Sequence, residues 1–303
     1  MSKNCPSQSY GGDKKNDKKD KFDMDKCFEV AYEAIRKATD NVMAAIKLEQ
    51  PFKSVKTTRD LLTKWDTEIE KMLMCSIKAE YPNHKIIAEA KQNRHHWKGP
   101  KMTDEPTWFI DSIDGTRNFV HGFPYVGLTV AFFVNKQPEF GIMWNPLIDQ
   151  CFASRRGLGT YMNAERIHVT KHSTLAEALV LHDLDTNMDQ LPEALENISR
   201  VAQIAHAMRS LGSAAASMCM IARGLADAYY NFGCHCWDIA APMLIVQEAG
   251  GVVLDPSLKP VDIMSRRVLV AATPQLAEEL SKQLVAIDIS PKGEAACSKT
   301  QED

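Results

Sequence analysis

The sequence of 303 residues is 45% hydrophobic and 25% charged, which is enough apolar material for one large or two medium globular domains. A net charge of −3 without a basic stripe excludes nucleic-acid binding from the predicted functions. The clearest mostly apolar run, Tyr125 to Val134, has ten residues and is too short to span a membrane. No apolar signal-peptide core follows Met1, so the sequence predicts a cytoplasmic protein whose eight cysteines are reduced.

The two ends of the chain are polar and low in complexity. Residues 1–23 interleave lysine with aspartate, and residues 291–303 contain few large apolar side chains. Neither composition can bury a core, so we expect a disordered N-terminal tail and a flexible C-terminal tail. A membrane-surface or partner-binding role for the first tail is less favoured, because its acidic residues cancel much of its basic charge.

Helical and strand patterns follow each other in the first half. Apolar residues recur with helical spacing from Phe28 to Val42, and again from Leu62 to Ile77. A mobile loop is expected over 90–106. The expected strands in this half are Lys85–Glu89, Trp108–Ile113, Tyr125–Val134 and, after a turn at Asn135-Lys136, Glu139–Trp144.

From about Ala178 the pattern changes to alternating strands and helices. The expected strands are Leu179–Leu181, Ala226–Tyr230, Val252–Leu254 and Val268–Ala271. The expected helices are Leu191–Ala205, Ser213–Arg223, Asp238–Glu248 and one more at the end. Helices with antiparallel strands followed by an α/β half predict two lobes, residues 24–165 with the metal site and residues 166–290.

Two aspartates close an apolar strand. Asp111 and Asp114 end the run that starts at Trp108, and Gly115 then lets the backbone turn sharply. Two carboxylates at the end of a buried strand cannot both lose water without a counter-charge, and hard divalent cations take oxygen ligands. The N–H groups of the following turn can face an anion. The pattern therefore indicates a metal and a phosphate, although Asp and Gly are also common in ordinary turns.

Other candidate residues are weaker when taken singly. Glu89 also closes an apolar strand, which alone is more often structural. Asp238 opens a helix, where an aspartate at the N-cap contributes about 1 kcal/mol and could also turn its carboxylate to a metal. The run 234–236, Cys-His-Cys, lacks the second ligand pair that a structural zinc site needs. The small residues Gly212, Ser213 and Ala214 either allow close packing or present N–H groups to a ligand.

Taken together, these residues resemble the inositol monophosphatase family of lithium-sensitive, Mg²⁺-dependent phosphatases. Two signatures carry the resemblance, one from Trp108 to Phe119 and one from Trp237 to Pro242 that continues to Gly251. The resemblance implies a layered αβαβα sandwich, usually a homodimer, in the α+β or α/β class. It also implies two or three Mg²⁺ ions and hydrolysis of a small phosphate monoester, inositol 1-phosphate above all, by water and without a covalent intermediate.

The resemblance implies roles for individual residues. The implied metal ligands are Glu89, Asp111, the backbone carbonyl of Ile113, Asp114 and Asp238. Thr116 and Asp66 resemble the dyad that activates the attacking water, which Glu89 helps to orient. The implied substrate contacts are the N–H groups of Gly115 and Thr116 for the phosphate, and Gly212, Ser213, Ala214, Asn231 and Asp238 for the sugar-alcohol ring.

Three positions depart from the family pattern. Ala90 replaces an acid and Lys91 adds a positive charge, so weaker metal binding is expected there. Asn231 stands where the inositol phosphatases have a glutamate that contacts a ring hydroxyl, and an amide can hydrogen-bond but carries no charge. Two alternatives therefore stay open: a phosphatase for another small sugar or nucleotide phosphate, and a low-activity paralogue that acts as a binding protein.

Overall fold

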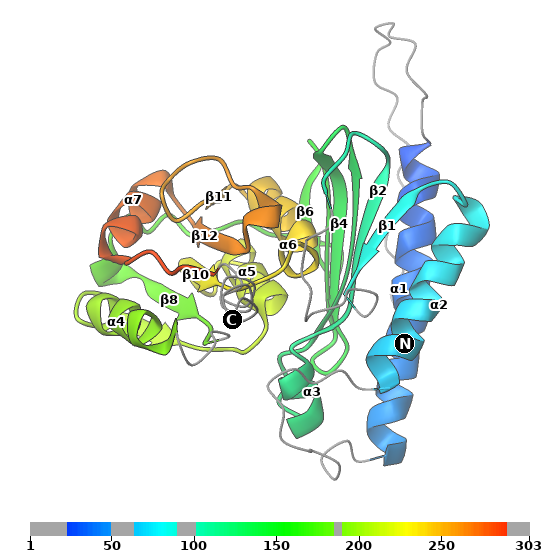
Figure 1. Ribbon diagram of the computed structural model, residues 1–303, viewed down its shortest axis with the longest axis horizontal. Helices are drawn as coiled ribbons and strands as arrows, with labels where there is room; N and C mark the ends of the chain where they lie inside the picture. Colours follow the sequence, from blue (N-terminus) through cyan, green and yellow to red (C-terminus); the bar gives the residue numbers. More distant parts are fainter. Residues whose placement is uncertain (1–22, 50–63, 90–100, 185–189, 290–303) are drawn as a thin grey trace, which may run out of the picture.

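Five layers of helices and sheets make up the fold in the computed structural model (Figure 1), which describes residues 23–49, 64–89, 101–184 and 190–289. From one side to the other lie a helix pair, a seven-stranded sheet, a second helix pair, a five-stranded sheet and a third helix pair. The predicted αβαβα sandwich is confirmed. The predictions for Leu62, Ala90 and Lys91, and those for nearly all of both tails, concern residues outside the described ranges.

The first layer consists of α1 (Met24–Glu49) and α2 (Lys64–Glu80). Apolar side chains of both helices, including Ile35 and Leu73, pack with Trp108 against the outer face of the seven-stranded sheet. The helical spacing in the sequence therefore marked the face that is buried.

The seven strands lie in the same order in space as in the chain. They are β1 (Lys85–Ala88), β2 (Thr107–Asp114), β3 (Gly127–Val134), β4 (Gln137–Asn145), β5 (Gln150–Arg155), β6 (Gly159–Met162) and β7 (Glu165–Arg166). Only β1 and β2 are parallel. The predicted turn between β3 and β4 has Asn135 and Lys136 at φ of 52° and 62°, as a tight hairpin requires. A short helix, α3 (Thr116–His121), follows β2 and was not predicted.

The middle layer is formed by α5 (Ala214–Ala222) and α6 (Cys236–Glu248). Every residue of α5 is buried, because the two sheets cover the layer from both sides. Ser213 caps α5, but α6 begins two residues earlier than predicted, with His235 at its N-cap. The expectation that Asp238 is the N-cap was therefore wrong, and Asp238 occupies the third helical position.

The second sheet has the order β11-β12-β10-β8-β9. Its strands are β8 (Leu179–His182), β9 (Ala207–Arg209), β10 (Ala228–Phe232), β11 (Val252–Leu254) and β12 (Arg267–Ala271). The helices α4 (Leu191–Ala202) and α7 (Pro274–Gln283) cover its outer face, and the short 3₁₀ turns η3 (Leu175–Glu177) and η5 (Ile263–Ser265) complete the described elements. β10 is parallel to β8 and antiparallel to β12. The division into lobes at residues 165 and 166 stays a prediction.

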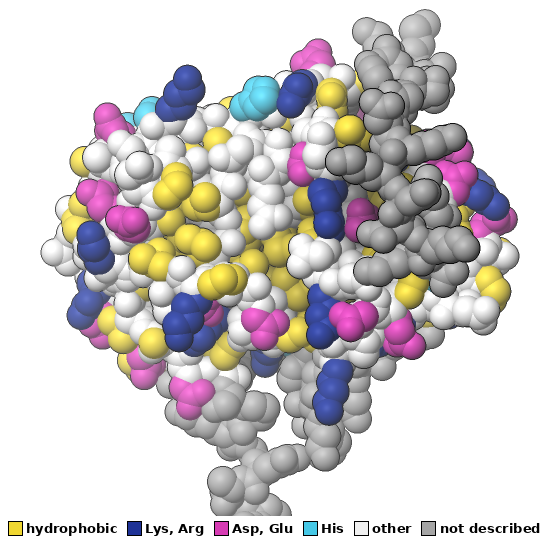
Figure 2. Space-filling model, turned by 90° about the horizontal axis from the view of Figure 1, so that it is seen from above, with side chains coloured by type: hydrophobic (Ala, Val, Ile, Leu, Met, Phe, Trp, Pro, Cys, Tyr) yellow, Lys and Arg dark blue, Asp and Glu magenta, His cyan; other side chains and the backbone are white. Residues whose placement is uncertain are grey.

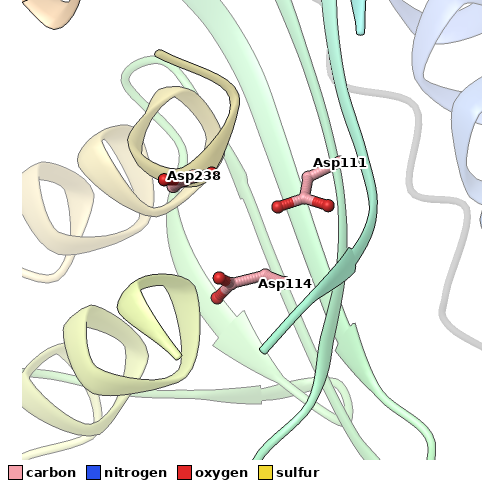
Figure 3. A group of neighbouring side chains, drawn as sticks. All are labelled: Asp111, Asp114 and Asp238. Atoms are coloured by element: carbon pink, nitrogen blue, oxygen red, sulfur yellow. The ribbon is translucent and has the colours of Figure 1, made fainter. Parts of the chain in front are cut away.

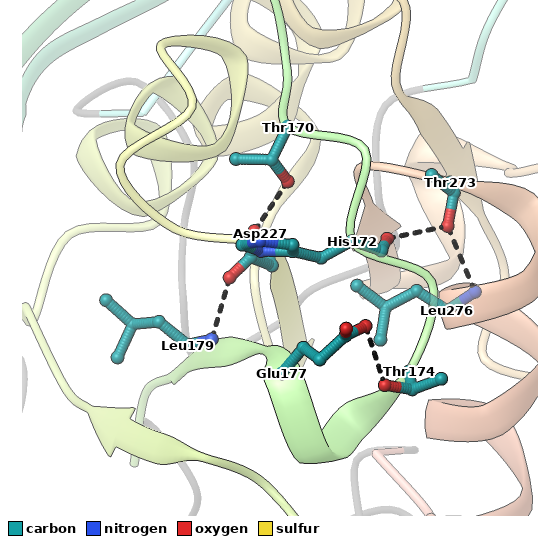
Figure 4. Close-up of polar contacts among 8 residues, drawn as sticks. All are labelled: Thr170, His172, Thr174, Glu177, Leu179, Asp227, Thr273 and Leu276. Atoms are coloured by element: carbon teal, nitrogen blue, oxygen red, sulfur yellow. Dashed lines mark hydrogen bonds and ion pairs between the residues drawn. The ribbon is translucent and has the colours of Figure 1, made fainter.

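The buried carboxylate of Asp227 holds residues 167–178, the segment that joins the two sheets, by hydrogen bonds (Figure 4). Asp227 accepts the Thr170 hydroxyl on Oδ1 and also contacts Nδ1 of His172 there, at 2.9 Å. Its Oδ2 accepts the N–H of Leu179 at 2.8 Å, where β8 begins. The joining segment is thereby attached to the start of β10.

Helix hydrophobicity and the distribution of charge on one face of the molecule can be compared with the expectations from the sequence. No helix in the described ranges is both long and apolar enough to cross a membrane. On the face drawn in Figure 2, basic and acidic side chains lie among each other around a central group of hydrophobic ones. This mixture differs from the basic stripe that nucleic acid attracts.

Helix α6 approaches the first sheet at a glycine. A Cβ on Gly141 of β4 would lie 2.5 Å from the carbonyl oxygen of Ala241, in the backbone of α6. Only glycine allows this contact, which fixes the distance of α6 from the sheet.

We predict that Gly141→Ala lowers the melting temperature, because a methyl group there forces the α6 backbone away at a cost of about 1–3 kcal/mol. The matched control is Gly127→Ala on the neighbouring strand, where the nearest atom to the new Cβ would be Cε at the end of the Met143 side chain, at 2.9 Å, and no backbone atom is among its nearest neighbours. Thermal denaturation of both variants measures the difference. Equal melting temperatures would contradict the close packing of α6 on β4.

Candidate active site

Three aspartates from distant parts of the chain converge (Figure 3). Asp111 and Asp114 come from the end of β2, and Asp238 comes from the first turn of α6. One carboxylate oxygen from each lies within 4.8 Å of the others. The structure thus brings together the acids of the two sequence signatures.

A backbone N–H group holds one oxygen of each aspartate. Oδ1 of Asp111 accepts the N–H of Ile113 at 3.0 Å. Oδ2 of Asp114 accepts the N–H of Ala215 at 2.7 Å, and Oδ2 of Asp238 accepts that of His235, also at 2.7 Å. Hydrogen bonds to an ionised acceptor are stronger than neutral ones, so they fix the orientation of the three side chains.

Ser213 also holds Asp114. Its hydroxyl donates to Oδ2 of Asp114 and accepts the N–H of Ala216 at 3.1 Å. The residue is therefore both the N-cap of α5 and a support for an aspartate of the cluster. Neither role was predicted, because Ser213 was expected to be the first residue of the helix itself.

The cluster is strongly unfavourable without a cation. Burial raises the pKa of Asp111 well above its usual value, and the charges of Glu89, Asp114 and Asp238 raise it further. Glu89 follows β1, whose last residue pairs with Ile110, and so lies beside Asp111. A set of carboxylate oxygens that repel one another fits a hard divalent cation such as Mg²⁺.

A hydroxyl–carboxylate pair is also present. Oγ1 of Thr116 lies 3.3 Å from Oδ1 of Asp66 and 3.0 Å from the carbonyl oxygen of Ile113. Asp66 is fully buried in the first turn of α2. The structure therefore joins the two residues predicted as a dyad, although they are far apart in the sequence.

The turn after β2 contacts the start of α5. Gly115 has φ of +82°, and a Cβ there would lie 3.2 Å from both the carbonyl oxygen of Gly212 and Cβ of Ser213. Nδ2 of Asn118 donates to the carbonyl oxygens of Tyr125 and Leu211, at 2.7 Å each. The predicted phosphate turn and the predicted ring segment, Gly212 to Ala214, are thus neighbours.

Asn231 has a different environment from the other predicted site residues. It is 1% exposed on β10, its Nδ2 donates to the Tyr229 hydroxyl at 2.9 Å, and its Oδ1 accepts the N–H of Cys234 at 3.2 Å. Both polar atoms of its amide are therefore hydrogen-bonded within the protein. Sequence analysis missed Asp183, which accepts the same Tyr229 hydroxyl, although it closes an apolar strand as Glu89 does.

Comparisons with known proteins agree on one family. A family model described as the inositol monophosphatase family matches residues 23–288. Inositol monophosphatase 1 of Bos taurus is 40% identical over 270 residues, which cover 87% of this chain and 95% of the bovine protein. An IMPase of Thermotoga maritima has a TM-score of 0.71 at 26% identity, with 86% of this chain and 95% of that one covered. Inositol monophosphatase-II of Staphylococcus aureus has a TM-score of 0.72 at 23% identity, with 85% and 92% covered.

We predict that Asp111→Asn stabilises the protein in the presence of a chelator. The amide keeps the acceptor for the Ile113 N–H but removes a buried charge from the cluster, and each kcal/mol gained raises the melting temperature by about 2–4 °C. Saturating Mg²⁺ should raise the melting temperature of the unsubstituted protein more than that of the variant. A variant that is less stable than the unsubstituted protein in chelator would contradict the electrostatic account of the cluster.

Proposed function

This chain belongs to the inositol monophosphatase family, and we propose that it is a Mg²⁺-dependent phosphatase that hydrolyses inositol 1-phosphate. The observation that carries the proposal is the convergence of three aspartates beside Glu89, at a place where burial already raises the pKa of Asp111. A phosphatase of this family needs a cation at such a place.

The proposed metal ligands are the carboxylates of Glu89, Asp111, Asp114 and Asp238 with the carbonyl oxygen of Ile113, for two or three ions. Mg²⁺ held there supplies the positive charge that lets water attack a phosphate dianion, and it stabilises the leaving alkoxide. The N–H groups that hold the aspartates keep their oxygens in place, so that little reorganisation is needed when an ion or substrate binds.

Thr116 and Asp66 are proposed to position the attacking water. When the Thr116 hydroxyl donates to Asp66, its lone pairs are available to accept a hydrogen bond from the water. The proton that the water loses can then pass through the hydroxyl to the buried carboxylate, while Glu89 orients the water. The oxygen of the water and its second proton end on the phosphate, the leaving alkoxide takes a proton from solvent, and Asp66 returns its own proton to solvent.

The substrate itself is proposed to lie against a surface formed jointly by the turn after β2 and the start of α5. The N–H groups of Gly115 and Thr116 would hold the phosphate, and Gly212 to Ala214, with Asp238, would border the ring. These segments already touch, because a Cβ on Gly115 would meet Gly212 and Ser213. Asn231 has the least capacity for a ring contact, because both polar atoms of its amide are hydrogen-bonded within the protein.

The environment of Asn231 favours a second candidate, a phosphatase for another small sugar or nucleotide phosphate. A neutral amide that is already hydrogen-bonded offers a ring hydroxyl less than a carboxylate does. The fold neighbour SaIMPase-II has been solved with inositol monophosphate and with 2′-AMP, at 22% identity in both cases. At that identity the likeness concerns the fold alone, which can hold either kind of phosphate.

Phosphate release from a small panel separates these candidates. Inositol 1-phosphate, 2′-AMP and the ring-free glycerol 2-phosphate are compared with Mg²⁺ and with a chelator. We expect Mg²⁺-dependent release with the highest kcat/KM for inositol 1-phosphate. A higher value for 2′-AMP would support the second candidate, and no Mg²⁺-dependent release from any substrate would support the low-activity paralogue.

We predict that Thr116→Ala lowers kcat by about a hundredfold or more, because a positioned proton acceptor is lost from the reaction. KM for inositol 1-phosphate should change much less, since the backbone N–H of residue 116 remains. Steady-state kinetics in saturating Mg²⁺ measures both constants, and Thr129→Val serves as a control for a lost buried hydroxyl, since Oγ1 of Thr129 bonds the Trp237 carbonyl. A change confined to KM would assign Thr116 to binding alone.

Three further properties implied by the family stay predictions: inhibition by lithium, a homodimeric state and a cytoplasmic location.

A further inference from the structure

We propose that Asp183 is a positioning residue that, through Tyr229 and Asn231, sets the spacing between the starts of α5 and α6 and thereby the affinity for the metal. The inference rests on the proposed function, because it concerns the same cation site. It assigns a role to a buried acid that neither the metal cluster nor the Thr116 dyad uses.

Asp183 receives hydrogen bonds from three donors. It is buried at the end of β8, where Oδ1 accepts the N–H of Gly212 at 2.7 Å and the Ser210 hydroxyl at 3.2 Å. Its Oδ2 accepts the hydroxyl of Tyr229 at 2.9 Å. A buried carboxylate with donors on both oxygens holds these groups tightly, because each bond is charge-assisted.

The network continues along one face of β10. Tyr229 and Asn231 are two residues apart and so project to the same face of the strand. Nδ2 of Asn231 donates to the Tyr229 hydroxyl at 2.9 Å, and Oδ1 of Asn231 accepts the N–H of Cys234 at 3.2 Å. An unbroken chain of hydrogen bonds therefore runs from Gly212 to Cys234 through side chains that are nearly all buried.

Both ends of this chain adjoin groups that hold aspartates of the metal cluster. Gly212 precedes Ser213, whose hydroxyl donates to Asp114. Cys234 precedes His235, whose N–H donates to Asp238 at 2.7 Å. A shift at either end of the network is therefore passed to one of the two aspartates through a single residue.

The separation of these two aspartates matters because Mg²⁺ demands near-ideal octahedral geometry at short distances. A network that fixes the starts of two helices preorganises the ligands before the ion arrives. The Tyr229 hydroxyl is its central member, since it donates to Asp183 and accepts from Asn231. Removing it separates the two halves of the network while the aromatic ring still fills its place.

Tyr229→Phe and Tyr230→Phe form a matched pair of variants. Each loses one phenolic hydroxyl from the same buried strand, but Tyr230 belongs to the core on the opposite face. The Tyr230 hydroxyl has no hydrogen-bond partner among the described residues. Asp183→Asn is a third variant, which keeps the shape of the side chain.

Binding of Mn²⁺ to the full chain is measured by electron paramagnetic resonance of the free ion, and Mg²⁺ half-saturation is measured with glycerol 2-phosphate, which has no ring. We expect Tyr229→Phe and Asp183→Asn to weaken Mn²⁺ binding and raise the Mg²⁺ requirement by about tenfold, the lower end of the range for hydrogen bonds lost around a metal site. Tyr230→Phe should match the unsubstituted protein.

Equal Mn²⁺ affinity in Tyr229→Phe and Tyr230→Phe would overturn the inference, and so would a loss of melting temperature in Tyr229→Phe and Asp183→Asn without any change in Mn²⁺ affinity. Failure of the proposed function looks different, because the unsubstituted protein would then release no phosphate in a Mg²⁺-dependent way. Mn²⁺ binding in the variants is measured independently of that result.

Discussion

The burial of several negatively charged carboxylates close together is the constraint on which the site and its surroundings depend. Burial and three neighbouring acids raise the pKa of Asp111, so the folded chain holds a cluster whose negative charge is relieved by a proton or by a bound metal ion. The protein nevertheless keeps these side chains in place through backbone N–H groups from β2, α5 and α6. The fold therefore stabilises an arrangement of oxygens that is costly by itself and useful once an ion is bound.

The two helices of the middle layer, α5 and α6, position groups that hold this arrangement. Both α5 and α6 lie between the two sheets, and their starts lie where the aspartates meet. Gly141 fixes the distance of α6 from β4, and Ser213 connects the start of α5 to Asp114. Packing and hydrogen bonding thus act on the starts of the same two helices. A change in core packing that moves either helix therefore also moves an aspartate of the metal cluster or a group that holds one.

Much of this was visible in the sequence, and the rest depended on contacts between distant segments. The apolar run that ends at Asp111 predicted β2 and the metal cluster, because a carboxylate at the end of a buried strand requires a counter-charge. Strands β5 to β7 were not predicted, since they are short and mix polar with apolar residues, and β7 is exposed at both positions. The role of Asp183 was hidden because its partners, Gly212 and Tyr229, belong to elements whose proximity no local pattern reveals.

The N–H groups that hold the aspartates also make the site depend on contacts between distant parts of the chain. The N–H group that donates to Asp111 belongs to a residue only two positions away. The one that donates to Asp114 belongs to Ala215, in the second half of the chain. Bringing such distant segments together costs chain entropy, which is offset only by the contacts that the segments then form. The complete set of ligand oxygens therefore depends on a contact between segments 101 residues apart. An ion that needs all of these oxygens binds only chains in which the starts of α5 and α6 lie beside β2.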